Sequence, residues 1–279
     1  MFGVSPWAIC CVIGFWLAVA LAEQRARVAG MPKPALHAAL TWVFGTAFLM
    51  GHLVDVLFYH RELLSQPASL VHFFNGQSST GGFLGAVVGG WLWSRILVER
   101  RGVRFSVARR PAPVALLPLA DILCATYPAA FFFGRLGCAL IHDHPGRLAP
   151  AGSWLALAWP VSPSDGAVHE LGPLRYVYGS SSRYDLGLLE CGFTLLIALA
   201  FAATWRRPLA LGSYACAVCL AYPPVRFTLD FLRVEGVVDA DPRYVGLTFA
   251  QWFCVAMFAC GVGLALQLGR ARAVAHASS

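Results

Sequence analysis

Two arginines stand in parts of the chain that are otherwise strongly apolar. Arg135 comes just after the run Ala129-Ala-Phe-Phe-Phe133, and Arg226 comes directly after Ala221-Tyr-Pro-Pro-Val225. A guanidinium at the edge of hydrocarbon is tolerated when it reaches the interface, pairs with an acid or holds a ligand. Its planar fork binds phosphate through two parallel hydrogen bonds, so two such groups at one interface suit the head group of an anionic phospholipid. Ordinary anchoring of helix ends at the membrane surface is the alternative.

A polar cluster follows Arg135 at a short distance along the chain. His142, Asp143 and His144 stand together, directly before Pro145-Gly146. Imidazole titrates near neutral pH, so the cluster could supply a general base. A solvated turn is the alternative, because Pro-Gly favours one. No metal site is predicted, since no second group of residues with ligand spacing accompanies the cluster.

Two further groups of residues could contribute to a site. The string Thr80-Gly81-Gly82 begins an apolar run. Its glycines either let helices pack closely or let backbone N–H groups approach an anionic ligand at a helix start. His52 and Asp55 are three residues apart, on one face of a predicted helix. Ionisable groups inside a membrane are functional candidates, and a mutual or interhelical pair is the alternative.

The composition is that of a membrane protein. Hydrophobic residues make up 58% of the chain and charged residues 13%, and the mean hydropathy is +0.64. Apolar runs long enough to cross a bilayer as helices recur along the whole length. We predict an all-α integral membrane protein with seven transmembrane helices, the first of them retained rather than cleaved as a signal peptide. The predicted spans are 4–22, 38–59, 79–98, 114–138, 184–205, 209–228 and 247–268.

The basic residues are distributed unevenly between the predicted connections. The formal net charge is +7, and 13 of the 21 Lys and Arg residues lie near the end of, or in the connection after, the first, third, fifth and seventh spans. The positive-inside bias then places the N-terminus outside the cytoplasm and the C-terminus inside it. These basic loops are interpreted as topology determinants, and nucleic acid is not expected as a partner. The nine cysteines fall mostly inside predicted spans and are interpreted as packing residues.

The polar connections on the predicted non-cytoplasmic side are the larger ones. Residues 141–182 form the longest of them and are predicted to make a small head region above the membrane. Within this insertion, the sequence 174–178 is typical of a short strand. The connections 60–80, 141–182 and 230–247 are expected to meet on the side where Arg135 and Arg226 emerge.

These strings resemble the prolipoprotein diacylglyceryl transferase family of bacterial inner-membrane enzymes. The family signature Gly-Arg-x-Gly-Asn-Phe-x-Asn-Gly-Glu-x-x-Gly is similar to residues Gly134 to Gly146, with both first glycines, the arginine, an acid at Asp143 and the last glycine retained. Further family strings are similar to Thr80-Gly81-Gly82-Phe83-Leu84-Gly85, to Asp185, Leu186 and Glu190, to Arg226-Phe227-Thr228-Leu229-Asp230-Phe231-Leu232-Arg233, and to Leu247-Thr248-Phe249-Ala250-Gln251-Trp252, and Asp121 falls where the family has an aspartate.

The resemblance implies a single polytopic membrane domain over residues 1–279 in the bacterial inner membrane. The implied reaction, a step of lipoprotein biosynthesis, transfers the diacylglyceryl group of phosphatidylglycerol to the lipobox cysteine of a preprolipoprotein and releases glycerol phosphate. Phosphatidylglycerol, the preprolipoprotein and membrane lipids are the expected partners, and no cofactor is required. The implied catalytic residues are Arg135, Arg226, His142, His144 and Asp143. The implied substrate-binding residues are Thr80, Gly81, Gly82, Gly134, Gly137, Gly146, Asp230, Arg233, Cys138 and His52.

The chain also departs from the family pattern. Thr80 replaces the histidine of the family's His-Gly-Gly string, Cys138 replaces the first asparagine of the signature, and His52 stands where the family has an arginine. A thiol nucleophile must lose its proton, so His142 or His144 would have to supply the missing base. Two alternatives follow: a divergent paralogue that acts on another lipid or acceptor, and a non-catalytic membrane protein that binds lipid or lipoprotein.

Overall fold

Seven α-helices form most of the described part of the protein. The computed structural model describes residues 5–65, 76–101, 104–142, 144–150, 153, 155–160, 167–171, 174–234 and 241–277. The helices in these ranges are α1 (Pro6–Val28), α2 (Lys33–Val54), α3 (Ser79–Arg95), α4 (Leu117–Ile141), α5 (Leu186–Thr204), α6 (Ser213–Asp230) and α7 (Phe249–Ala277). Each predicted apolar run corresponds to one of these helices, so the prediction of a mainly helical membrane protein is confirmed.

Five of the described helices are long and apolar enough to cross a membrane. They are α1, α2 together with the π-helical turn Asp55–Tyr59 that extends it, α4, α5 and the first 23 residues of α7. The other two are shorter, since α3 has 17 residues and α6 has 18. Their apolar sequence is also less uniform. Helix α3 contains several glycines, and α6 contains two prolines and an arginine.

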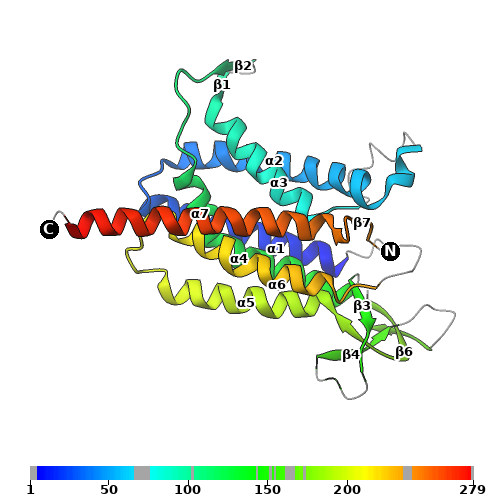
Figure 1. Cartoon of the computed structure of the whole chain (residues 1–279). Helices are drawn as coiled ribbons and strands as arrows, with labels where there is room; N and C mark the ends of the chain where they lie inside the picture. Colours follow the sequence, from blue (N-terminus) through cyan, green and yellow to red (C-terminus); the bar gives the residue numbers. More distant parts are fainter. Residues whose placement is uncertain are drawn as a thin grey trace.

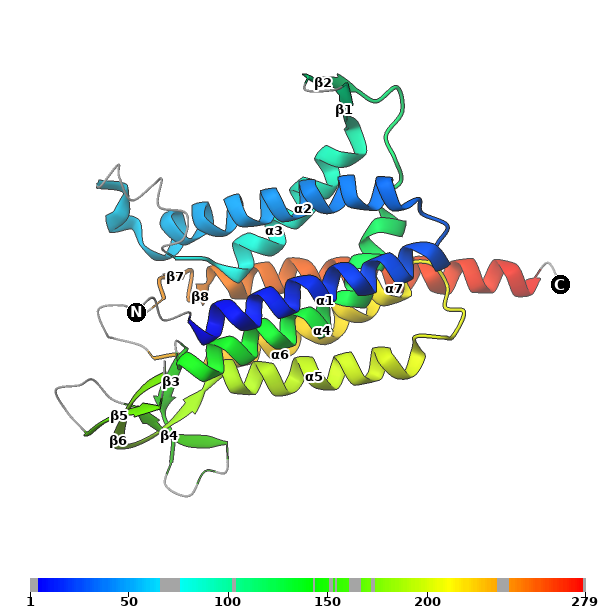
Figure 2. The same cartoon turned by 180° about the vertical axis from the view of Figure 1, so that it is seen from behind.

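The helices are arranged as a bundle with a separate helical pair at its side. Helices α1, α4, α5, α6 and α7 run alongside one another, while α2 and α3 pack mainly on each other (Figures 1 and 2). The N-terminus lies at one end of the bundle, near a small β-sheet, and we call this the head end. The α1–α2 and α5–α6 connections and the C-terminus lie at the opposite end (Figures 1 and 2).

The sheet at the head end has strand β6 (Leu174–Asp185) at its centre. Strands β3 (Pro145–Leu148), β4 (Ala156–Pro160) and β5 (Ala167–Leu171) all pair antiparallel with it. The strand predicted at 174–178 lies within β6. A second hairpin at this end, β7 (Arg243–Tyr244) and β8 (Leu247–Thr248), precedes α7. A 3₁₀ turn, Arg61–Ser65, follows the π-helical turn after α2.

The third helix is shorter than the predicted span 79–98. It ends at Arg95, and Ile96 adopts an extended conformation. Strands β1 (Ile96–Arg101) and β2 (Arg104–Arg109) then form an antiparallel hairpin that projects from the side of the bundle (Figure 2). Val98 pairs with Val107 across the two strands. Branched side chains favour such a pleated pair over continuation of the helix, and hydropathy alone does not register this preference.

Glycines allow α3 to approach α2 at backbone distance. A Cβ atom added at Gly85 would lie 2.6 Å from Cα of Ala47, and one at Gly89 would lie 2.6 Å from the carbonyl oxygen of Trp42. The Thr46 hydroxyl donates to the carbonyl of Gly85 at 2.7 Å. Close packing of this kind is how small residues hold helices together in lipid.

Buried contacts join the helices into one core. One cluster consists of Ala22, Ala26, Leu36, Ala39, Leu40, Trp93, Leu119 and Ile122, from the first four helices. A second consists of Ala125, Ile197, Phe201, Tyr214, Val218 and Tyr222, from α4, α5 and α6. Between them, Oδ1 of Asp121 accepts hydrogen bonds from the backbone N–H groups of Tyr214 (2.8 Å) and Ala215 (3.0 Å). Asp121 thereby satisfies free donors at the start of α6.

Candidate active site

A buried ion pair joins α4 to α5 near the head end. Nε of Arg135 lies 2.9 Å from Oε2 of Glu190, and both side chains are 4% exposed. The N–H of this Nε is not aligned for a hydrogen bond, so the attraction is that of an ion pair. A charge is stable at such depth only when it is paired. Glu190 is the one acidic residue within α5, and it therefore determines where Arg135 is held.

The outer nitrogens of Arg135 bind groups from two other segments. Nη2 donates to the Ser79 hydroxyl at 3.1 Å, and Nη1 lies 3.1 Å from Nε2 of His144. A guanidinium can only donate, so the second contact requires His144 to present the lone pair of Nε2. Arg135 also lies over the ring of Phe131, with 4.8 Å between Cζ and the ring centroid. The arginine is thus fixed from three sides.

Arg226 is the centre of a second group of charges, next to the first. Nε of Arg226 lies 3.8 Å from Oε1 of Glu190, and Nη1 donates to Asp230, which is fully buried. Asp230 also accepts from Nε of Arg233 at 2.9 Å and from the Thr248 hydroxyl. Arg226 and Asp230 stand one helical turn apart at the end of α6, which places their side chains on one face. Arg233 follows shortly after the helix ends.

The network continues to the loop before α7. Nη1 of Arg233 lies 2.7 Å from Oδ2 of Asp241. Thr248 is held in turn by Gln251, whose side-chain oxygen accepts from the Thr248 N–H at 2.9 Å. Among the described residues, the network therefore connects three arginines with three carboxylates. These charges are preorganised, because each is fixed by a partner from another element.

An aromatic cluster borders the charged network. Tyr222 donates to Oε1 of Glu190, and its ring packs edge-on against Tyr127 and Phe131. Phe83 of α3 contacts the same rings and stacks on Phe253 of α7. The cluster is one of the connections between α3 and the bundle. It gives the arginine site an apolar side that suits hydrocarbon chains.

His142 stands apart from Arg135, on the carboxylate of Asp185. Nδ1 of His142 lies 3.0 Å from Oδ2 of Asp185, whose other oxygen caps α5 by accepting from Leu188 N–H at 2.9 Å. His142 ends α4 in the left-handed conformation, with φ of 52°. The family signature has glycine here, which adopts this conformation without strain. Of the two histidines in the predicted cluster, His144 contacts Arg135 and His142 contacts Asp185. Asp143 lies outside the described residues.

The glycines predicted to bind substrate occupy different surroundings. A Cβ at Gly137 would lie 3.0 Å from Cα of Trp7 on α1, and one at Gly146 would lie 2.6 Å from the carbonyl oxygen of Tyr184. These two residues therefore sit at backbone contacts. No atom lies within 4 Å of a Cβ placed at Gly134. The thiol of Cys138 lies 3.9 Å from Nη1 of Arg135.

The residues predicted around the start of α3 are divided between packing and the site. Gly81 abuts α2, since its Cβ would lie 2.7 Å from Cβ of Val54, whereas the corresponding space at Gly82 is open. Thr80 is buried, and it is the preceding residue, Ser79, whose hydroxyl contacts Arg135. His52 is fully buried on α2, with Nδ1 3.5 Å from the carbonyl of Gly76. Asp55 pairs with His60 at 3.1 Å.

The structure adds two residues that the sequence motifs did not assign to the site. Ser79 directly precedes Thr80, Gly81 and Gly82, which were predicted to bind substrate. The sequence alone does not show which of the two hydroxyl residues, Ser79 or Thr80, faces the site. Glu190 entered only through a loose similarity, although a carboxylate inside an apolar helix is itself a signal, because such a group is costly without a partner. That criterion singled out His52 and Asp55, and it applies equally to Glu190.

The fold and the site together define a class of protein. The chain is a polytopic helical membrane protein whose paired arginines lie inside the bundle, next to an aromatic cluster and close to one end. Such a site can hold an anionic head group while its aromatic side accommodates acyl chains.

Comparison with known proteins supplies the family. The family model described as "Prolipoprotein diacylglyceryl transferase" matches residues 1–267. The chain therefore belongs to the prolipoprotein diacylglyceryl transferase family, and the prediction of a membrane-bound transferase of this family is confirmed.

Three relatives illustrate how far the similarity extends. Each is named phosphatidylglycerol–prolipoprotein diacylglyceryl transferase. The protein from Neisseria gonorrhoeae is 27% identical over 277 residues, which cover 93% of this chain and 89% of the relative. The protein from Aromatoleum aromaticum is 28% identical, with 94% and 92% covered, and that from Rhodopseudomonas palustris is 29% identical, with 87% and 76% covered.

Proposed function

We propose that this chain transfers the diacylglyceryl group of phosphatidylglycerol to the lipobox cysteine of preprolipoproteins. The cysteine sulfur forms a bond to the glyceryl carbon, and the bond between that carbon and a phosphate oxygen breaks. Both electrons of the broken bond go to the phosphate oxygen, so glycerol phosphate leaves and a thioether remains. The observation that carries the proposal is the buried arginine pair held by Glu190 in a member of this family.

The two arginines stabilise the departing phosphate. Negative charge grows on the phosphate oxygen as the carbon–oxygen bond lengthens, and fixed cations in a water-poor site stabilise that charge at no cost of reorganisation. Glu190 and Asp230 hold the guanidinium groups in place, while Ser79 and His144 mark the side of Arg135 that faces away from Glu190. The acyl chains of the lipid lie toward Phe83, Phe131 and Tyr222.

His142 accepts the thiol proton, with Asp185 as the residue that positions it. Their contact through Nδ1 selects the tautomer in which Nε2 carries the lone pair, as in other base–carboxylate pairs. This arrangement takes over from the family's His-Gly-Gly histidine, which is Thr80 here. His144 helps to position Arg135, the residue that binds the phosphate. Asp143 stays a candidate for orienting an arginine or a histidine.

The head end faces away from the cytoplasm. The positive-inside bias supports this orientation, because the α1–α2 and α5–α6 connections lie at the opposite end with the C-terminus (Figure 1). In or directly next to these connections stand Arg25, Arg27, Lys33, Arg206 and Arg207. An exported preprolipoprotein then meets the arginine site from the non-cytoplasmic side. Residues 141–182 form the head region on that side of a single membrane domain.

Complementation tests the proposal directly. The full chain is expressed in a bacterial strain depleted of its own diacylglyceryl transferase, with its membrane level verified by immunoblotting. Rescue of growth and of lipoprotein maturation is the expected result. A chain that reaches the membrane in normal amounts and restores neither would favour a divergent paralogue or a non-catalytic lipid-binding protein.

A further inference from the structure

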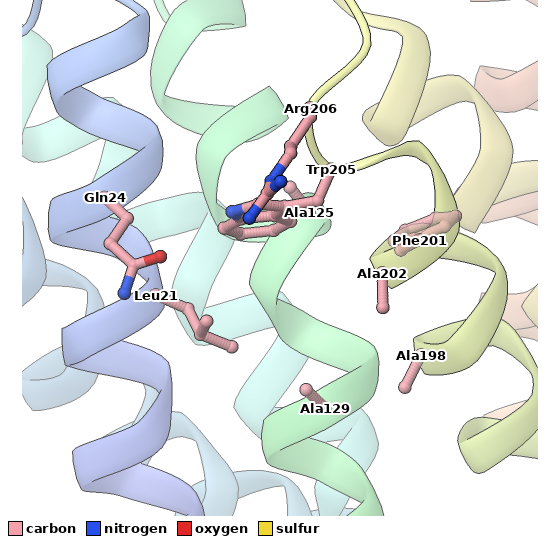
Figure 3. A pocket seen from close by; sticks show the side chains of 9 residues that line it. All are labelled: Leu21, Gln24, Ala125, Ala129, Ala198, Phe201, Ala202, Trp205 and Arg206. Atoms are coloured by element: carbon pink, nitrogen blue, oxygen red, sulfur yellow. The ribbon is translucent and has the colours of Figure 1, made fainter.

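A cavity that none of the arginine-site residues lines lies between α1, α4 and α5. Its volume is 350 Å³, and it is lined in part by Leu21 of α1, Ala129 of α4 and Ala198 of α5 (Figure 3). Four of the lining residues on α4 and α5 are alanines, and they leave a space that larger side chains would fill. We call this cavity the α1–α5 groove. It lies toward the end of the bundle opposite the head end.

The walls of the groove belong to the lipid-facing part of the molecule. Helices α1, α4 and α5 are all long and apolar enough to cross a membrane. Hydrocarbon rather than water therefore surrounds the groove along most of its length. An acyl chain fits such a surface, because it fills an apolar channel between helices without leaving backbone polar groups unpaired.

One end of the groove is polar and positively charged. Three residues line this end: Gln24 of α1, and Trp205 and the exposed Arg206, which directly follow the last residue of α5 (Figure 3). Among the described residues that line the groove, none is acidic. Tryptophan and arginine at a helix end are typical of the depth at which lipid head groups lie.

A second arginine, Arg25, holds Trp205 in place at this end of the groove. Nη1 of Arg25 donates to the Trp205 carbonyl at 3.3 Å, and Cζ lies 5.3 Å from the Trp205 ring centroid. Nε of Arg25 is buried and has no hydrogen-bond partner among the described residues. Cζ of Arg25 also lies 4.9 Å from the ring centroid of the buried Tyr214, so Arg25 positions Trp205 and is not part of the groove lining.

We propose that the α1–α5 groove binds one phospholipid with an anionic head group, from the leaflet opposite the head end. One acyl chain lies between α1 and α5 over the alanines of α4, and the lipid phosphate lies at Arg206. The lipid acts as a structural ligand that fills the space between α1 and α5. This site is separate from the arginine pair of the proposed reaction.

Native mass spectrometry of the full chain tests this proposal. Protein delipidated in detergent is titrated with dioleoyl phosphatidylserine, and with dioleoyl phosphatidylcholine as the zwitterionic reference. Arg206→Gln removes the exposed cation, and Arg207→Gln is its matched control, since Arg207 is also exposed but does not line the groove. Ala198→Leu fills the groove, and Ala200→Leu places the same side chain on an exposed position of α5.

The parent is expected to bind one phosphatidylserine more tightly than phosphatidylcholine, and the two groove variants to bind it more weakly. Arg206→Gln weakens that binding step on the order of fivefold, the effect of one cation near a lipid phosphate, and Ala198→Leu weakens it at least as much. Both controls bind like the parent. Every variant keeps Arg135 and Arg226, so lipid held there is the same in all. Parent-like binding by Arg206→Gln and Ala198→Leu, or an equal loss in Arg207→Gln, overturns the proposal.

Discussion

Glu190 shows how one side chain can organise a charged site inside a membrane protein. Its two oxygens face Arg135 and Arg226, and Tyr222 donates to one of them. Loss of this carboxylate would leave two arginines at least partly uncompensated in a buried site, which is far more costly than loss of a surface charge. The carboxylate therefore sets the spacing of the two guanidinium groups and, with it, the geometry offered to a phosphate.

Replacing either arginine by lysine tests whether the guanidinium itself is required. Arg135→Lys and Arg226→Lys keep the charge but lose the planar fork, and we expect the rate of transfer to fall by about 10²-fold or more. Arg147→Lys, on the exposed edge of β3, is the matched control and should keep the parent rate. Near-parent rates in the Arg135 and Arg226 variants, at equal protein levels, would make these residues anchors of the helix ends.

His142 offers a substitution that separates chemistry from folding. Glycine tolerates the left-handed backbone of His142, so His142→Gly should keep the free energy of unfolding within about 1 kcal/mol of the parent. The single-turnover rate should nevertheless fall about 10²-fold, as is usual when a general base is lost. His144→Ala should lower the rate without abolishing the pH dependence that His142 confers.

Single-turnover transfer measured as a function of pH distinguishes these outcomes. If His142→Gly, His144→Ala and the double variant all keep the parent's rate and pH profile, then neither histidine takes the thiol proton. The proton would in that case pass to the substrate or to water.

At the level of single residues, the sequence predicted the arginines more readily than their partners. Arg135 and Arg226 follow apolar runs, where placing a charge in lipid is energetically unfavourable, and this identified them as candidates for a functional role. Ser79 could not be distinguished from Thr80, because which hydroxyl faces Arg135 depends on the rotation of α3 against α4. The separation of His142 from His144 was also not predictable, since it depends on the left-handed turn at the end of α4.

Among the helices, the α2–α3 pair shows how sequence specifies close packing. Gly81, Gly85 and Gly89 recur at intervals of one helical turn and face α2. Single glycines also allow close contacts in the bundle, such as Gly137 against α1, but only α3 carries such a regular series among the described helices. The pair is joined to the bundle through Phe83 and through the buried cluster around Trp93, so the position of Ser79 beside Arg135 depends on these contacts.

A pair of alanine substitutions tests this packing. Gly85→Ala places a methyl group against the backbone of α2 and should destabilise the protein by about 1–3 kcal/mol, the usual cost of overpacking. Gly82→Ala, on the open side of the same helix, should leave stability nearly unchanged. Thermal unfolding in detergent measures both. Equal midpoints for the two variants would contradict the close α2–α3 contact.

The elements themselves were largely predictable, with one informative exception. Runs of apolar residues identified every α-helix in the described part of the chain, because backbone groups in lipid must be satisfied within the helix. The β1–β2 hairpin was missed, since hydropathy continues past Arg95 while the conformational preference changes at Ile96. The extent of β6 beyond 174–178 was missed as well, because strand pairing depends on segments distant in sequence.

For the whole molecule, orientation in the membrane is the property that connects site and substrate. The arginine site can receive an exported preprolipoprotein only if the head end is outside the cytoplasm. Reporter fusions at Arg109 and at Arg147 should label opposite sides of the membrane, with Arg147 outside. Labelling of both on the same side, or Arg147 in the cytoplasm, would contradict the orientation inferred from the basic residues.

The central claim, transfer of a diacylglyceryl group to a cysteine, is tested most directly by the product itself. Purified protein is incubated with phosphatidylglycerol vesicles and a lipobox peptide, and the peptide mass and the released glycerol phosphate are measured together. We predict that the peptide gains one diacylglyceryl group on its cysteine for each glycerol phosphate released, and that a peptide with serine in place of the cysteine is unchanged. A folded protein that binds phosphatidylglycerol but yields neither product would contradict the claim.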